Sequence, residues 1–526
     1  MHNNNEFLPE SVDVLVVGNG PVGATLASLL GRYGVDCLVI DKAHDVLPLP
    51  RAIALDNEAL RILQLAGLEE DAFETVVIPH VKMHCPIVGQ FGQANTSGRI
   101  DGHHKLVTFY QPDLERAMRS QAEQHGTLRC RGGLELRDFT QDASGVTAVL
   151  LDEADEPHSL RCRYLVGADG ASSRVRGLIG QEFNGQSYSE DWLIVDAGSR
   201  QGKAIDHVEF LCDHRRPTPH MPAPGGRERW EFMLRPGETR DEMEDQERIR
   251  GLLAPWIEPQ QLKIERKAVY RFHARCCESF QQGRVFLVGD AAHITPPFVG
   301  QGLVAGLRDV ANLAWKLSWV LQGRATPRIL DSYDQERQPH AREMIDLAKL
   351  MGRLVMPSNA VAAALIHSFM KALRIIPAAR RHFEELDIKP RHRFRRGLFV
   401  RSTRRARVAS GGLFPQAWVR SAGRICLSDQ LLGDRLQLVG LGTDPRRWLD
   451  SAQQKQWFDL GGSFLQIGHA RDDSRADFAE SLDGALLAPW PDPALAVVRP
   501  DRIIMHQCRP EKAGELLRHC QALLRA

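Results

Sequence analysis

Residues 13–42 read DVLVVGNGPVGATLASLLGRYGVDCLVIDK, and this stretch decides the fold of the N-terminal part of the chain. A short apolar run leads through Gly18, Gly20 and Gly23 into a segment of helical periodicity, and a second apolar run ends at Asp41. This order of strand, glycine-rich turn, helix and strand is typical of a dinucleotide site, because the glycines let the backbone approach a pyrophosphate at the helix N-terminus. Asp41 lies 18 residues beyond Gly23, where an acidic side chain can bind ribose hydroxyls.

A second loop rich in glycine and proline, GDAAHITPPFVGQG, occupies residues 289–302. It follows RVFLVG, which is typical of a buried strand, so Asp290 lies at a strand end, where doubly wound sheets bind ligands. A short acid there suits a hydroxylated linker such as a ribityl chain. Pro297 stiffens the loop, and Gly300 and Gly302 open a long helix whose N-terminus stabilises negative charge. Because a reduced flavin is negative around N1 and the C2 carbonyl, the two loops predict the two ends of one FAD.

Composition excludes several classes of protein. The net charge of +1 gives no overall attraction to nucleic acid or to an anionic membrane. The ten cysteines form no CxxC or zinc pattern, which favours a reduced, cytoplasmic protein without a metal site. The N-terminal sequence lacks a signal peptide, and polar residues interrupt the most apolar later stretch, so we expect no membrane span.

Changes in composition and in the hydrophobic pattern along the sequence predict four regions. Residues 1–184 and 272–345 form a discontinuous FAD-binding domain, and some strands near 80–110 belong to the substrate domain. Residues 185–271 form an inserted, mostly β, substrate-binding domain. A helical and arginine-rich connector (346–410) leads to a C-terminal α/β domain (411–526).

Three motifs, GNGPVG, GADGASSRVR and GRVFLVGDAAHITPPFVGQG, in this order and spacing, resemble those of the single-component flavoprotein aromatic hydroxylases. The resemblance spans nearly the whole chain. It implies an α/β fold with a Rossmann-like FAD-binding domain, an inserted mostly β substrate domain, a helical segment and a thioredoxin-like C-terminal domain. The implied C-terminal domain lacks CxxC, so we interpret it as structural or as stabilising a homodimer.

The resemblance also implies an activity. NADH or NADPH would reduce FAD, O2 would add to give a C4a-hydroperoxyflavin, and a phenolic ring would be hydroxylated in aromatic catabolism. One implied substrate is 3-(3-hydroxyphenyl)propionate, converted to its catechol. The alternatives are hydroxylation of another aromatic or heteroaromatic ring, or an FAD-dependent reductase that inserts no oxygen.

The cofactor contacts are implied residue by residue. Gly18, Gly20 and Gly23 are implied to contact the diphosphate, and Asp41 the ribose. Arg51 and Gln111 are implied to contact FAD, and Asp169 and Gly170 both FAD and the nicotinamide cofactor. The implied ribityl and flavin contacts are Asp290, Pro297, Gly300 and Gly302. Many relatives carry Asn two residues after the last glycine. Val304 stands there in this chain, so polar support for the flavin ring from that side chain is absent.

Asp56 is the candidate base that would deprotonate a phenol, because it lies five residues before Arg61, the spacing of the active-site acid in phenol hydroxylases. The alternative is that Asp56 only caps the following helix. Arg215, Arg216 and His220 could pair with a substrate carboxylate, or could belong to a solvated loop. Trp230 and Tyr270 are candidates for an aromatic substrate pocket, with core packing as the alternative.

Two other features have structural interpretations. His293 lies near the cofactor by motif, and we interpret it as a hydrogen-bonding residue rather than a base. The arginine-rich connector also contains acidic residues and no recognised nucleic-acid module, so a solvated linker or interdomain surface is favoured over nucleic-acid binding.

Overall fold

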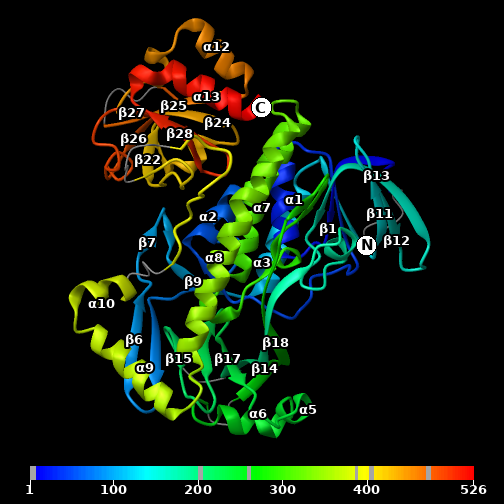
Figure 1. The fold of residues 1–526 in the computed structure, drawn as a ribbon, viewed down its shortest axis with the longest axis vertical. Helices are drawn as coiled ribbons and strands as arrows, with labels where there is room; N and C mark the ends of the chain where they lie inside the picture. Colours follow the sequence, from blue (N-terminus) through cyan, green and yellow to red (C-terminus); the bar gives the residue numbers. More distant parts are fainter. Residues whose placement is uncertain are drawn as a thin grey trace.

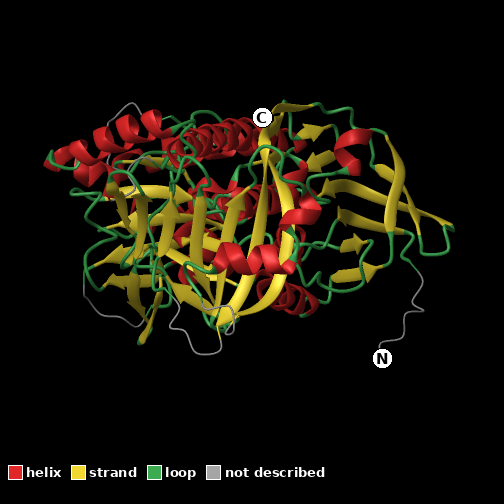
Figure 2. Ribbon diagram, turned by 90° about the horizontal axis from the view of Figure 1, so that it is seen from below, coloured by secondary structure: helices red, strands yellow, loops and turns green. Residues whose placement is uncertain are grey.

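The computed structural model describes residues 8–199, 205–257, 262–384, 389–401, 408–469 and 475–525. The chain forms three large sheets; in Figure 1 the C-terminal sheet lies at one end of the long axis, the sheet that contains β14 and β17 lies toward the other end, and the sheet that contains β1 lies to one side between them. Figure 2 shows strands running through the middle of the molecule, with helices above and beside them. Within the described residues, no helix is long and apolar enough to cross a membrane.

The first sheet carries the dinucleotide unit. Its main path runs in the order β10-β2-β1-β13-β12-β11, and β1 pairs in parallel with both β2 and β13. Helices α1, α3 and α7 pack together beside it. The strands are β1 (Ser11–Val17), β2 (Cys37–Asp41), β10 (Leu128–Gly132), β11 (Glu135–Gln141), β12 (Val146–Leu151), β13 (Pro157–Gly167), β19 (Gln281–Gln282) and β20 (Val285–Leu287).

The second sheet runs in the order β21-β18-β14-β17-β16-β15-β5-β6. One face is covered by the short helices α5 and α6, whose apolar side chains form a core with this sheet. The strands are β5 (His80–Cys85), β6 (Gly89–Asn95), β14 (Phe183–Ser199), β15 (Val208–Leu211), β16 (Thr218–Ala223), β17 (Arg227–Met233), β18 (Leu262–Cys277) and β21 (His293–Ile294). Strands from before residue 110 therefore complete the sheet of the inserted domain.

Helices connect and cover these sheets. The long helices α7 and α8 run between the bodies, and α9 and α10 lie against β6. The helices are α1 (Pro21–Arg32), α2 (Asn57–Leu65), α3 (Gln111–Glu123), α4 (Arg174–Leu178), α5 (Arg240–Met243), α6 (Gln246–Leu253), α7 (Gly302–Leu321), α8 (Asp331–Val355), α9 (Ala360–Leu373) and α10 (Pro377–Glu384). Small sheets are formed by β3 (Ala54–Asp56), β4 (Thr75–Val77) and β9 (Leu106–Phe109), and by β7 (Arg99–Ile100) and β8 (His103–His104).

The C-terminal domain has the topology of a thioredoxin-like fold. A parallel β24-α12-β25 unit is followed by the antiparallel pair β27 and β28 and by α13, with β24 between β25 and β27. The elements are β22 (Trp418–Ser421), β23 (Arg424–Leu427), α11 (Asp429–Leu432), β24 (Leu436–Leu441), α12 (Ser451–Asp459), β25 (Gly462–Gly468), β26 (Phe478–Ser481), β27 (Ala494–Val498), β28 (Ile504–Cys508) and α13 (Ala513–Arg525). The predicted fold class is thus confirmed, while the predicted domain boundaries stay a proposal.

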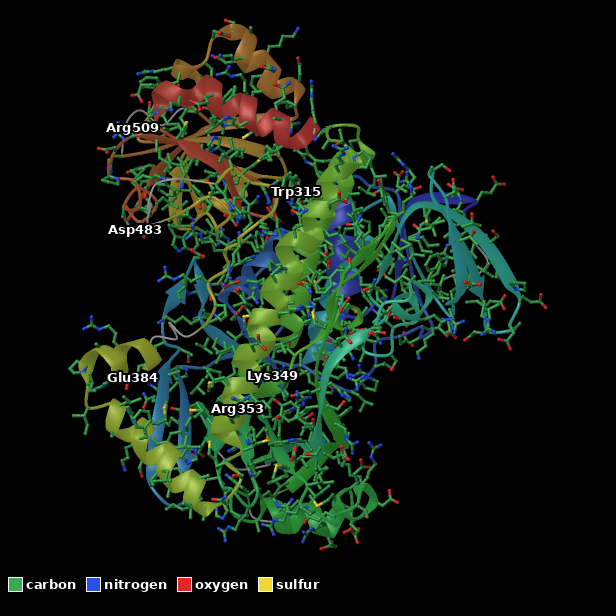
Figure 3. All side chains as sticks on the ribbon, in the orientation of Figure 1. Trp315, Lys349, Arg353, Glu384, Asp483 and Arg509 are labelled. Carbon is green, nitrogen blue, oxygen red and sulfur yellow. The ribbon has the colours of Figure 1, made fainter. Side chains whose placement is uncertain are left out.

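Buried ion pairs join the C-terminal domain to the rest of the chain. Arg499 donates to the two carboxylate oxygens of Glu336 on α8 at 2.7 and 2.9 Å. Its guanidinium lies 5.2 Å from the ring centre of Trp315 on α7, beside the C-terminal domain in Figure 3. Arg61 on α2 donates to both oxygens of Asp429 at 2.8 Å. Because these charges are almost fully desolvated, each depends on its partner, and removing one partner would destabilise the contact between the C-terminal domain and the rest of the chain.

Candidate active site

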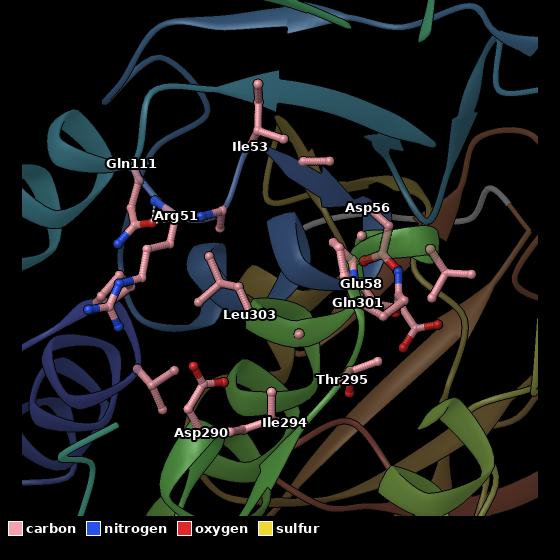
Figure 4. A pocket seen from close by; sticks show the side chains of 18 of the residues that line it. Arg51, Ile53, Asp56, Glu58, Gln111, Asp290, Ile294, Thr295, Gln301 and Leu303 are labelled. Carbon is pink, nitrogen blue, oxygen red and sulfur yellow. Dashed lines mark hydrogen bonds between the residues drawn. The ribbon is translucent and has the colours of Figure 1, made fainter. Parts of the chain in front are cut away.

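A cavity of about 1170 Å³ lies where the first two sheets, the start of α7 and the connector meet. It exceeds the roughly 300–1,000 Å³ typical of pockets for small ligands, so it has room for a dinucleotide and a second ligand. Eleven of the twelve predicted cofactor residues line it: Gly18, Gly20, Asp41, Arg51, Gln111, Asp169, Gly170, Asp290, Pro297, Gly300 and Gly302. Figure 4 shows part of this cavity, with Arg51 and Gln111 on one side and Asp56 and Gln301 on the other.

The first glycine-rich loop has the geometry of a phosphate cradle. Gly18 has a φ of +105°, which an L side chain rarely adopts. A Cβ on Gly20 would meet nothing within 4 Å, so this glycine leaves open space in front of the α1 N-terminus. Gly23 does not line the cavity; a Cβ there would lie 1.9 Å from the carbonyl oxygen of Gly18, so this glycine allows α1 to approach the loop. These features fit a diphosphate.

Two acidic residues hold the loops around this cradle. Asp41, at the end of β2, accepts hydrogen bonds from the backbone N–H groups of Asn19 (2.7 Å) and Ala43 (2.9 Å). Asp169 accepts from the hydroxyl of Ser173 (2.6 Å) and from the N–H groups that begin α4. Both carboxylates therefore shape the backbone and also face the cavity.

The loop that contains Arg51 is positioned by Gln111. The Gln111 side-chain oxygen accepts from the backbone N–H groups of Arg51 and Ala52, at 2.8 Å each. Arg229 and Arg266 on the second sheet donate to the carbonyl oxygen of Pro50, and Arg229 also donates to that of Arg51. The loop is thus tied to both domains at the edge of the cavity.

The second predicted loop presents an uncapped helix N-terminus. Among the described residues, no side chain caps the N-terminus of the 20-residue helix α7, and Gly300 just before it has a φ of +61°. Asp290 faces the same region; burial raises its pKa, and the charges of His293 and Arg51 oppose this only in part. An open helix N-terminus stabilises the negative charge of a reduced flavin, so this loop fits the redox end of FAD.

Two neighbours of this loop lie in the core. Val304 is fully buried and does not line the cavity. The ring nitrogen Nε2 of His293 lies 2.7 Å from a carboxylate oxygen of Asp309, and Arg337 donates to the other oxygen at 2.8 Å. His293 therefore has the hydrogen-bonding role predicted from the sequence.

The carboxylate of Asp56 accepts several hydrogen bonds. One carboxylate oxygen accepts from the N–H of Ala59 at 2.9 Å and caps α2. The other accepts from Gln301 at 3.0 Å and from Lys389 at 2.6 Å. Burial acts to raise the pKa of Asp56, but the charges of Lys389 and Arg308 outweigh it and hold this pKa below its usual value. Asp56 lines the cavity as a paired anion that binds protons weakly.

The structure does not bring the predicted substrate residues into the cavity. Arg216 donates to Glu238 at 2.5 Å, and the rings of His220 and Trp230 stack with centres 4.5 Å apart on the face covered by α5 and α6. Tyr270 packs in an apolar cluster, and its hydroxyl accepts from Arg266 at 2.9 Å. Arg216, His220, Trp230 and Tyr270 are therefore not among the residues that line the cavity. Side chains alternate along a strand, and the residues beside His220 and Trp230 are those that face the cavity.

The cavity wall formed by the second sheet and its neighbouring helices is apolar and contains one acid. It consists of side chains from the second sheet, the loop before α7, and helices α8 and α9: Val81, Met83, Val208, Phe210, Pro219, Met221, Glu231, Phe298, Leu347, Leu350, Met351, Leu354 and Met370. In RERWEFM (227–233), Arg227, Arg229 and Glu231 stand at alternate positions, and alternate residues of a strand share a face. This pattern was the signal that could have predicted a charged face containing Glu231.

The connector forms another part of the wall that we did not predict. Lys389, Arg391 and Arg393 line the cavity. Lys389 pairs with Asp56 and Glu58, whereas the guanidinium groups of Arg391 and Arg393 make no hydrogen bond or ion pair with any residue that the structure describes. A run of arginines is usually a solvated surface, so the sequence alone did not identify this wall.

Two protein-family models match the chain. The model of the FAD binding domain family matches residues 11–348, and that of the HcaD C-terminal domain matches residues 411–523. The chain is 34% identical over 511 residues to 3-(3-hydroxy-phenyl)propionate/3-hydroxycinnamic acid hydroxylase 2 of Burkholderia vietnamiensis, covering 94% of this chain and 93% of that protein. It is 30% identical over 579 residues to the corresponding hydroxylase of Comamonas testosteroni, covering 99% and 98%.

Solved structures share the fold. The flavin-dependent monooxygenase PieE, solved with FAD and substrate, superposes with a TM-score of 0.83 at 23% identity, covering 98% of this chain and 99% of that one. Aklavinone-11 hydroxylase, solved with FAD and aklavinone, gives a TM-score of 0.79 at 23% identity, covering 98% and 100%.

Proposed function

Because the chain belongs to the FAD-dependent aromatic hydroxylases that share the FAD binding domain, we propose that it hydroxylates a phenolic ring carrying a carboxylate side chain. NADH or NADPH is the electron donor and O2 the oxidant. One observation carries the proposal: both FAD loops and an apolar wall with cationic groups line the same cavity. 3-(3-Hydroxyphenyl)propionate, named for the relatives, has this chemistry.

FAD is the cofactor, and the residues described above fit it. When bound, FAD supplies the transfer of electrons from NAD(P)H to O2, which standard side chains do not perform. In this proposal, the open cradle at Gly20 receives the diphosphate and Asp41 the ribose hydroxyls. Asp290 would hold the ribityl hydroxyls, and the N-terminus of α7 would stabilise negative charge on the reduced flavin.

The apolar wall binds the substrate ring and excludes water. Phe210, Met221 and Phe298 contribute to it from separate elements, and each packs within an apolar cluster. Burying a ring against such a surface contributes about 25 cal/mol for each Å² removed from water. The same burial keeps bulk water from the reacting carbon.

Arg391 and Arg393 supply the site for the substrate carboxylate. Both face the cavity, and neither guanidinium is neutralised by a described residue. An arginine can bind a carboxylate through two parallel N–H···O bonds, which are stronger than neutral hydrogen bonds. An acidic side chain on the ring is therefore favoured over a neutral one of the same length.

The reaction is tested with the purified FAD-loaded protein. NADH and NADPH oxidation, O2 uptake and product mass are measured with 3-(3-hydroxyphenyl)propionate and with its neutral analogue 3-propylphenol. We expect stimulated oxidation and a product heavier by one oxygen atom. If the reduced cofactor is consumed without any hydroxylated product, the monooxygenase proposal is wrong and the reductase alternative takes its place.

The carboxylate site is tested with Arg391→Met and Arg393→Met. Loss of a charged hydrogen bond of about 1.5–3 kcal/mol raises KM for the acid by roughly 10- to 150-fold, and KM for 3-propylphenol changes little. The matched control is Arg395→Met, because Arg395 lies in the same connector, is 84% exposed and pairs with Glu343. Equal effects on the acid and the neutral phenol would refute this role.

A further inference from the structure

Glu231 is an acid in the apolar wall of the cavity. It lies on β17, pairs across the sheet with Ile194 on β14, and is 8% exposed. Pro219 and Met221 on the neighbouring strand line the same wall. The carboxyl group therefore lies where a ring packed against this sheet would meet it.

Glu231 makes no hydrogen bond or ion pair with the residues that the structure describes. The two nearby guanidinium groups have other partners. Arg229 donates to both oxygens of Asp196, at 2.6 and 3.0 Å, and to the carbonyl of Arg51. Arg266 donates to Asp196 and to the hydroxyl of Tyr270. A buried carboxyl without a partner is costly, so a ligand that satisfies it gains affinity.

The electrostatics of this position match a proton acceptor near neutral pH. Burial raises the pKa of Glu231 to about 7; Arg229 and Arg266 act to lower it, and Asp196 adds to the increase. A general base is most effective when its pKa is near the working pH.

The other acids that line this cavity near the connector or the FAD loops have different roles. Asp56 is paired with Lys389 at 2.6 Å, which lowers its affinity for protons. Asp41 accepts two backbone N–H groups, and Asp290 belongs to the loop that we assign to FAD. Glu231 is thus the buried acid on the substrate wall whose oxygens are available to a ligand.

Resting on the proposed function, we propose that Glu231 is the catalytic base that accepts the proton of the substrate's phenolic hydroxyl. The O–H bond of the phenol breaks and an O–H bond forms on a Glu231 carboxylate oxygen. The carboxylate becomes a neutral acid and the substrate becomes a phenolate, so charge is conserved and no electrons are exchanged. The phenolate has more electron density at the ring carbons that hydroxylation attacks, and the acid later returns its proton to water.

The kinetic test compares wild-type holoenzyme with Glu231→Gln, which keeps the shape and a hydrogen-bond acceptor but does not accept the proton. We expect kcat for an ordinary phenol at pH 8 to fall by about 100-fold or more, within the range for loss of a general base. The acid limb of the wild-type pH profile, near pH 7, should disappear. Fluorinated phenols that are already ionised at pH 8 should lose much less activity.

A binding test separates this role from a structural one. Perturbation of the flavin spectrum in the oxidised enzyme, without NAD(P)H, reports the Kd for a phenol and for its methyl ether. Glu231→Gln should bind both normally. Glu231→Leu, which removes the acceptor, should weaken phenol binding by roughly 10-fold and leave the ether unchanged.

Glu228→Gln is the matched control, because Glu228 lies on the same strand, is also 8% exposed, and contacts His220 on the other face. If Glu231→Gln keeps the wild-type kcat and pH profile, or if Glu228→Gln causes the same loss, the assignment of the base is overturned. If the wild-type enzyme hydroxylates no phenol, the proposed function itself fails, and the two failures are thereby distinguished.

Discussion

Replacing Glu231 by Gln should stabilise the protein above neutral pH, although it removes the proposed base. Burial raises the pKa of Glu231 from 4.5 to about 7. Below pH 4.5 the carboxyl group is protonated in both the folded and the unfolded chain, so wild type and Glu231→Gln should be about equally stable. Between pH 4.5 and 7 the unfolded chain loses this proton while the folded protein keeps it. The wild-type protein therefore loses stability relative to the variant as the pH rises through this window.

The size of the effect follows from the two pKa values. Each unit of pKa difference corresponds to about 1.36 kcal/mol. The variant should therefore be more stable than wild type by about 3 kcal/mol at pH 8, with the difference levelling off above pH 7. This magnitude applies to Glu231 because the residue is only 8% exposed, so solvent screens it little.

The assay is urea unfolding of the FAD-loaded proteins at pH 5 and pH 8, followed by far-UV circular dichroism and flavin fluorescence. Subtracting the wild-type free energy of unfolding from that of the variant removes the pH dependence of all other groups. Glu228→Gln provides the comparison for a Glu on the opposite face. A difference that stays the same between pH 5 and pH 8 would refute the reasoning that Glu231 is buried without a partner.

Two further predictions concern the cofactor loop and the C-terminal domain. Gly23→Ala should yield protein that does not retain FAD, because the new Cβ would lie 1.9 Å from the Gly18 carbonyl oxygen. The flavin content after gel filtration measures this loss. The control is Gly126→Ala, whose Cβ meets nothing within 4 Å and which should therefore retain FAD. Arg499→Met should destabilise the protein by about 3–5 kcal/mol, because it leaves the buried charge of Glu336 without its main partner. Denaturant unfolding measures this loss of stability. The control, Arg424→Met, lies at an exposed position of β23 and should have little effect. Equal stabilities of the two variants would contradict the docking role of Arg499.

Local patterns predicted residues that the fold brings to one cavity. The glycines at 18 and 20, Asp41, and the loop from Asp290 to Gly302 line one cavity because each lies at the end of a strand or the start of a helix, and these ends are determined by nearby residues. The helix cap at Asp56 is similarly local, since Asp56 accepts from an N–H only three residues away.

The predicted substrate residues Arg216, His220, Trp230 and Tyr270 do not line the cavity. His220 and Trp230 were chosen for their chemistry, but they pack under α5 and α6 on the far face of the second sheet. Side chains along a strand point alternately to the two faces of the sheet, but this alternation does not determine which face lines the cavity. That choice depended on helices that come later in the chain.

The sequence by itself determined the strand–turn–helix–strand unit of β1, α1 and β2 and the glycine-rich loop before α7, because glycine positions and apolar periodicity act over a few residues. Only the tertiary structure decided which acid is free and which is paired. Lys389 reaches Asp56 across 333 positions of the chain, and it lowers the pKa of Asp56. Glu231 forms no ion pair with a described residue, because the nearby Arg229 and Arg266 donate to Asp196 instead. Long-range packing therefore sets the charge and availability of these groups, because both depend on neighbours that only folding brings together.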